Sequence, residues 1–103
     1  MPILSISKIS SVVGGELRSN EANTELLISS ISIDSRTIFD PGSSIFFALK
    51  SERNDGYWYI ADLVHAGVRA FVVSDYSGEL LKYDNCSFVV VADTLKALQK
   101  LAA

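Results

Sequence analysis

Apolar residues recur along this chain in short runs, and their spacing distinguishes helices from strands. The first run predicts a short helix whose apolar face carries Ile6, Ile9, Val12 and Val13. Ser5 or Ser7 can cap the start of this helix, and Gly14-Gly15 supplies a left-handed stop. Residues 16–18 follow as a candidate short strand.

Strand patterns dominate the middle of the chain. Residues 26–33 predict one strand, because their second half alternates apolar and polar side chains. The turn at residues 40–43 is expected to use the fixed φ of Pro41 and a positive φ at Gly42. Three later runs are almost continuously apolar, which is typical of strands covered on both faces: residues 44–49, 69–74 and 88–91.

Two more helices are expected from the apolar spacing. One spans residues 57–66, ends at Gly67 and is expected to bury Ile60, Ala61, Leu63 and Val64. The other begins at the cap Asp93-Thr94 and places on one side Leu95, Leu98 and Leu101. The order strand–helix–strand, then strand–helix, predicts an α/β fold: a single small domain with a mixed or mostly parallel sheet and helices packed on it.

Composition narrows the class of protein. A chain of 103 residues suits one domain, and 49% hydrophobic residues with a net charge of -3 exclude intrinsic disorder. Twelve Asp and Glu against nine Lys and Arg argue against a nucleic-acid partner, which normally meets a basic face. The longest apolar runs are about a strand long and no secretory signal is present, so we expect a cytoplasmic protein with no membrane partner.

Candidate catalytic chemistry is sparse. His65 is the lone histidine and lies in a predicted helix, which favours a surface or part-buried residue near the helix end over a metal ligand. Cys86 precedes a strand with no base nearby, which favours a passive residue over a nucleophile. The sequence lacks a GxxxxGK[ST] phosphate loop, so we expect no nucleoside triphosphate site in this chain. With one histidine and one cysteine, we also expect no metal site and no catalytic residue.

Two polar segments follow predicted strands, and ligands collect at such positions in open α/β sheets. In the first segment, Ser35 can donate and accept hydrogen bonds, and Arg36 can fork onto a phosphate or carboxylate. An equally weighted alternative is a turn held by Asp34 and Arg36. The second segment, residues 50–56, is either a recognition loop or a solvated connector in which Asp55 caps the next helix.

Several short motifs, in their order and spacing, resemble the N-terminal domain of the Mur ligases, which build the peptide stem of peptidoglycan precursors. They are Ser32-Ile33-Asp34-Ser35-Arg36, Asp40-Pro41-Gly42, Ile45-Phe46-Phe47-Ala48-Leu49-Lys50, Asn54-Asp55-Gly56 and the run from Ala66 to Ser74. Residues 4–17 and 47–53 resemble the branch of this family that adds D-alanyl-D-alanine. Residues 54–56 and 67–69 resemble the version of that branch that is fused to an alanine racemase.

The resemblance implies that residues 1–103 form a domain that grips the uridine diphosphate (UDP) end of UDP-N-acetylmuramoyl-tripeptide. By resemblance, six residues contact the UDP moiety: Ile33, Ser35, Arg36, Glu52, Arg53 and Asn54. The resemblance implies no cofactor in this chain. ATP and Mg²⁺ would belong to the parent ligase, whose central and C-terminal domains activate the tripeptide carboxylate as an acyl phosphate for attack by D-alanyl-D-alanine.

Three alternatives remain open at this point. The chain could be a free-standing, non-enzymatic α/β module that binds another nucleotide or a sugar. It could be the corresponding domain of the family member that forms the tripeptide. It could also be a structural scaffold that packs on neighbouring domains or on a copy of itself.

Overall fold

A five-stranded sheet organises the computed structural model, which describes residues 3–19, 26–33, 40–49, 59–74, 80, 83 and 86–102. Across the sheet the strands are β2 (Glu16–Ser19), β7 (Ser87–Val90), β6 (Ala70–Val73), β5 (Ser44–Phe47) and β4 (Ser30–Ser32). Strands β4 to β7 are parallel, and β2 pairs with β7 in the antiparallel sense. The mixed, mostly parallel sheet confirms the predicted fold class.

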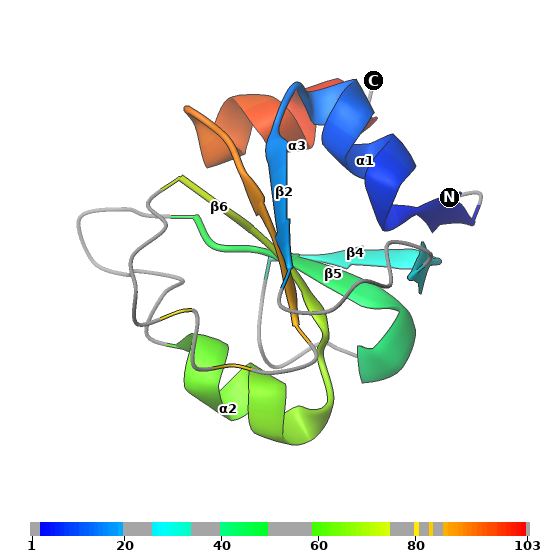
Figure 1. Ribbon diagram of the computed structural model, residues 1–103, viewed down its shortest axis with the longest axis vertical. Coiled ribbons are helices and arrows are strands. Elements are labelled where there is room, and N and C mark those ends of the chain that lie inside the picture. Colours follow the sequence, from blue (N-terminus) through cyan, green and yellow to red (C-terminus); the bar gives the residue numbers. More distant parts are fainter. Residues whose placement is uncertain are drawn as a thin grey trace.

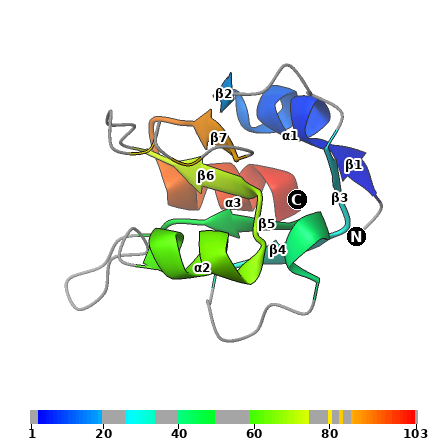
Figure 2. The same ribbon diagram turned by 60° about the horizontal axis from the view of Figure 1, so that its bottom comes forward.

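Helices cover both faces of this sheet (Figures 1 and 2). Helices α1 (Ile6–Val13) and α3 (Thr94–Ala102) pack together on one face, and α2 (Ile60–Ala66) packs on the other. The structure thus has three layers, with an apolar core on each side of the sheet.

Alternation along the central strands explains their continuous apolar sequence. In β5, Ile45 and Phe47 point into the core under α1 and α3, and Phe46 points into the core under α2. The other two central strands alternate in the same way: Ala70 and Val72 oppose Phe71 and Val73, and Val89 opposes Phe88. Both faces are therefore buried, as predicted for parallel strands.

The predicted strand at residues 26–33 is two strands in different sheets, which corrects the sequence analysis. Strand β3 (Leu27–Ile28) pairs antiparallel with β1 (Leu4–Ser5), whereas β4 pairs with β5. Between β3 and β4, the Ser29 amide donates a hydrogen bond to the carbonyl of Ser43, at 2.8 Å. Figure 2 shows β1 and β3 side by side next to α1.

The predicted ends of α1 are confirmed. Ser5 is the N-cap, and its hydroxyl oxygen accepts a hydrogen bond from the Lys8 amide at 3.1 Å. Gly14 ends the helix in the left-handed conformation, with φ of 69°, a region that glycine enters without a steric penalty. Gly67 ends α2 in the same way, with φ of 106°.

Three side chains of the predicted apolar helix faces are exposed: Val12, Leu95 and Ala61, the last of which was expected to be buried. The buried stripe of α1 is Ile6, Ile9, Ser10 and Val13, and Val12 lies beside it. On α3, Thr94 and Ala97 are buried, and Leu98 and Leu101 are partly buried. Leu95 lies beside this stripe and is exposed. On α2 the buried residues are Ile60 and Leu63, and Val64 is partly buried.

Two local predictions also need correction. Helix α2 begins at Ile60, because Tyr59, which was expected within the helix, lies in a 3-10 turn. Residues 57 and 58, where the predicted helix starts, lie outside the described part. Residues Pro41–Ser43 form a 3-10 turn, and Gly42 lacks the positive φ expected for it. In this turn the chain is held by the Ser43 amide, which donates to the carbonyl of Asp40 at 3.1 Å.

Candidate functional site

The carboxyl ends of four parallel strands meet at one edge of the sheet. Ile33 follows β4, Ala48 follows β5, Ser74 follows β6 and Val91 follows β7. Loops at this edge present side chains and free backbone groups, and ligands of open α/β sheets bind there. The polar segments singled out in the sequence follow the first two of these strands, so the topology supports their selection.

Ile33 is the one predicted site residue that lies within the described part of the chain. It directly follows β4, and its side chain is 55% exposed, in contrast to the buried Ser32 before it. An exposed aliphatic side chain at a strand end offers a flat apolar surface, and the face of a nucleobase or sugar ring can pack on such a surface. This location suits the uridine contact that the resemblance implies.

The end of β5 is fixed by backbone hydrogen bonds. The Ala48 amide donates to the carbonyl of Val72 at 2.9 Å, which extends the pairing of β5 with β6 by one residue. The Leu49 amide then donates to the carbonyl of Phe47 at 2.9 Å, and this tight turn directs the chain out of the sheet. The strand end that precedes the second polar segment therefore has a defined backbone.

The other five predicted residues lie outside the described part of the chain: Ser35, Arg36, Glu52, Arg53 and Asn54. Their roles stay predictions. The structure places only the strand ends that precede them. Strands β4 and β5 are neighbours, with Ser32 opposite Phe46, so the last described residues before the two segments, Ile33 and Leu49, lie at the same edge.

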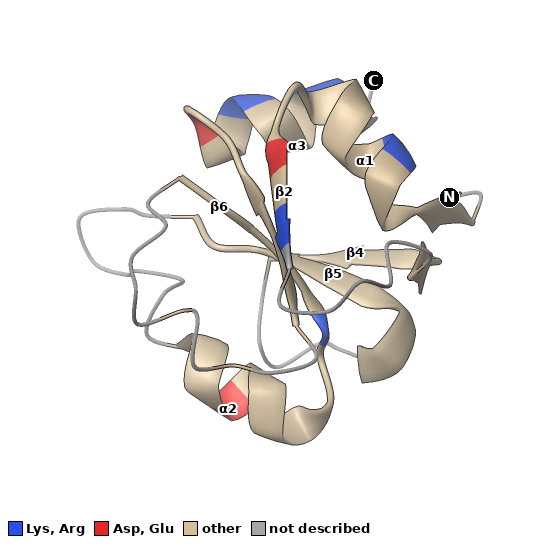
Figure 3. Cartoon of the chain, in the orientation of Figure 1, with Lys and Arg blue, Asp and Glu red and all other residues tan. Residues whose placement is uncertain are grey.

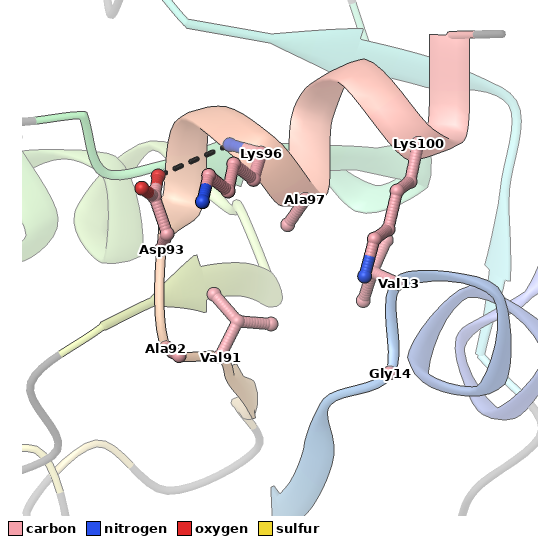
Figure 4. Close-up of a pocket in the computed structure, with 8 residues that line it drawn as sticks. All are labelled: Val13, Gly14, Val91, Ala92, Asp93, Lys96, Ala97 and Lys100. Atoms are coloured by element: carbon pink, nitrogen blue, oxygen red, sulfur yellow. Dashed lines mark hydrogen bonds between the residues drawn. The ribbon is translucent and has the colours of Figure 1, made fainter.

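A pocket at the end of β7 was missed by the sequence analysis. It has a volume of about 130 Å³ and is lined by Val13, Gly14, Val91, Ala92, Asp93, Lys96, Ala97 and Lys100 (Figure 4). The carboxylate of Asp93 accepts a hydrogen bond from the Lys96 amide at 3.1 Å and so caps α3, as predicted. The spacing of Lys96 and Lys100, one helical turn apart, was the only sequence signal for this pocket.

The two residues for which a passive role was favoured are placed accordingly. His65 is exposed in the last turn of α2. Cys86 is buried, and its Sγ donates a weak hydrogen bond to the carbonyl of Val68 at 3.8 Å. Among the described residues, no group of three His, Cys, Asp or Glu side chains could hold a metal ion. No helix in the described ranges is long and apolar enough to cross a membrane.

Comparison with known proteins identifies the family. A family profile described as "Mur ligase family, catalytic domain" matches residues 27–103. The chain belongs to the Mur ligase family, and the resemblance noted in its motifs is confirmed.

Within this family the chain is similar in sequence and in fold to MurF enzymes, which add D-alanyl-D-alanine. It is 34% identical over 91 residues to the UDP-N-acetylmuramoyl-tripeptide–D-alanyl-D-alanine ligase of Borreliella burgdorferi, which covers 82% of this chain. The chain is also 32% identical over 75 residues to the UDP-N-acetylmuramoyl-L-alanyl-D-glutamate–2,6-diaminopimelate ligase of Clostridioides difficile. This match covers 73% of the chain and 14% of the Clostridioides protein.

Solved structures of MurF from Acinetobacter baumannii share the fold of this chain. Two crystal structures superpose with a TM-score of 0.79 at 25% identity and cover 98% of this chain. The chain spans only 20% of the length of the Borreliella protein and of these MurF chains.

Proposed function

We propose that this chain is the substrate-anchoring domain of a ligase that adds D-alanyl-D-alanine to UDP-N-acetylmuramoyl-tripeptide, and that it binds the UDP end of that substrate. The main support is the position of Ile33, exposed at the carboxyl end of β4 in a domain with the MurF fold. The uracil ring packs on Ile33, and Ser35 and Arg36 reach its polar edge and the ribose or diphosphate. Glu52, Arg53 and Asn54 approach the nucleotide from the segment after β5.

In the proposed ligase, this chain binds the nucleotide end of the substrate and other domains bind ATP. The sequence contains no GxxxxGK[ST] loop to hold the phosphates of ATP. In this proposal ATP, Mg²⁺ and the reacting carboxylate are held by central and C-terminal domains of the same polypeptide, in the cytoplasm. Binding energy from the remote nucleotide then positions the tripeptide carboxylate for reaction, as remote contacts do in many enzymes.

A second candidate is the corresponding domain of the 2,6-diaminopimelate-adding ligase, favoured by the match to the Clostridioides protein. We prefer the D-alanyl-D-alanine-adding enzyme because the match to the Borreliella protein covers more of the chain, and because the similar solved structures are MurF. The fusion to an alanine racemase stays a prediction.

The proposed site can be tested by truncating two matched side chains. Ile33 and Leu95 are both exposed aliphatic residues, 55% and 52% exposed, but Leu95 lies on α3, outside the proposed site. Ile33→Ala should weaken UDP binding about fivefold, the effect of losing a few buried methyl groups, whereas Leu95→Ala should leave it unchanged. Equal effects of the two substitutions, measured by calorimetry or by NMR titration, would remove Ile33 from the site.

A further inference from the structure

The pocket between α1, α3 and the end of β7 has features that the proposed UDP site does not use. Figure 4 shows the side chains of Lys96 and Lys100 extending from α3 to the same side, over Val91, Val13 and Gly14. Ala97, which is 2% exposed, lies between them and forms the apolar floor. Figure 3 shows basic residues on both α1 and α3, and acidic residues at the start of α3 and on β2.

Neither lysine is neutralised within the described part of the chain. No described carboxylate lies within ion-pairing distance of Lys96 or Lys100. The one carboxylate in the pocket lining, that of Asp93, is engaged by the Lys96 amide at the start of α3. Two like charges one turn apart on a helix repel each other, and an anion between them would relieve that repulsion.

Lys100 also lies beside the end of α1. Its Nζ atom lies 4.0 Å from the point that a Cβ atom would occupy on Gly14, the C-cap of α1. The partial negative charge at a helix C-terminus attracts an ammonium group. This attraction favours a position of the Lys100 ammonium group beside the pocket.

The topology of the sheet also indicates a ligand-binding crevice at the carboxyl ends of β6 and β7. After β6 the described residues of the chain, Leu80 and Tyr83, pack on the α2 face, whereas after β7 the chain enters α3 on the opposite face. Neighbouring parallel strands whose chains leave to opposite faces create a crevice at their carboxyl ends, and ligands of open α/β sheets bind in such crevices. The pocket adjoins this crevice, because Val91, Ala92 and Asp93 line it.

We propose that this pocket binds an oxyanion, a phosphate or carboxylate group of a small-molecule ligand, between the ammonium groups of Lys96 and Lys100. The volume of about 130 Å³ is sufficient for such a group. This site is separate from the proposed UDP site, since it lies at β7, two strands away from β5 and three from β4. It does not depend on the proposed function.

The test is an NMR titration of this chain with inorganic phosphate at constant ionic strength, with acetate as a second arm. Phosphate should shift the amide signals of Gly14, Lys96 and Lys100 in a saturable way, with a dissociation constant on the order of millimolar. Binding of both anions at these residues assigns oxyanions in general, and binding of phosphate alone assigns phosphate groups. No saturable shift at these residues up to about 50 mM of either anion would overturn the proposal.

Four substitutions sharpen this test. Lys96→Gln and Lys100→Gln should each weaken phosphate binding about tenfold, the value of a charge-assisted hydrogen bond, whereas Lys8→Gln on the exposed side of α1 should not. Asp93→Asn keeps a capping side chain on α3 but removes its charge, and should tighten binding. Equal weakening by Lys8→Gln would show a diffuse charge effect and would also overturn the proposal.

Discussion

Gly15 lies directly against Val89, so that a Cβ atom on Gly15 would sit 2.6 Å from the Cγ1 atom of Val89. The same Cβ atom would be 2.9 Å from Cγ1 of Val91 and 3.1 Å from the carbonyl oxygen of Val90. Strand β2 begins at the next residue and pairs with β7 from Glu16 opposite Val90 onward. The absence of a side chain at residue 15 is therefore what lets the chain pass from α1 to the sheet edge.

Gly15→Ala should lower the free energy of unfolding by about 2 kcal/mol, because the new methyl group must displace two core valines and a strand carbonyl. Gly42→Ala is the matched control: among the described residues its Cβ atom would meet only Asp40 Oδ1, at 4.0 Å, and its φ is not positive. The control should change stability by no more than about 0.5 kcal/mol. Urea unfolding measures both, and equal losses would contradict the close approach of Gly15 to β7.

Phe71 is the centre of the core under α2. Its ring stacks on Phe88 with centroids 5.4 Å apart and meets Phe46 edge-on at 6.3 Å, and all three rings are almost fully buried. Phe71→Ala should cost about 3–5 kcal/mol, from lost burial and the cavity left behind. Leu27→Ala, at a side chain that is 55% exposed, should cost well under about 1 kcal/mol. A comparable loss for both in chemical denaturation would show that Phe71 is not a core residue.

The Ser5 hydroxyl satisfies an amide at the start of α1 that has no partner within the helix. Ser5→Ala should therefore destabilise the chain by about 1 kcal/mol, and Ser5→Asp should retain most of the capping. Ser11→Ala is the control, since Ser11 is exposed within the same helix and alanine favours helix there. Thermal unfolding distinguishes the two serines; a loss of stability in Ser11→Ala but not in Ser5→Ala would contradict this cap.

The central strands could be predicted because burial on both faces gives each of them a continuous apolar sequence. Residues 45–47 and 70–73 are apolar at every position, and burial on both faces is the condition that permits such a run. The division of residues 26–33 could not be predicted, because it depends on pairing of Leu27 and Ile28 with β1, some twenty residues earlier in the chain. Local alternation carries no information about which partner strand is available.

The two candidate sites also differ in how far the sequence alone could predict them. Ile33 could be selected because the motif around it is contiguous, and the structure places it at the expected sheet edge. The roles of Ser35, Arg36 and residues 52–54 remain predictions. The pocket of Lys96 and Lys100 depends on how the end of α1 meets α3 on one face of the sheet, and no local pattern encodes that contact.

The central claim, that this chain anchors the UDP end of a muramoyl-peptide precursor, is tested most directly by titrating the isotope-labelled chain with UDP-N-acetylmuramoyl-tripeptide and following the amide signals. We expect saturable shifts at Ile33 and in the segments that hold Ser35 and Arg53. UDP alone should reproduce these shifts, and Ser35→Ala should abolish them without loss of fold. Saturable shifts confined to Gly14, Lys96 and Lys100 would support only the separate oxyanion pocket. An unchanged spectrum at Ile33, Ser35 and Arg53 with millimolar ligand would contradict the account.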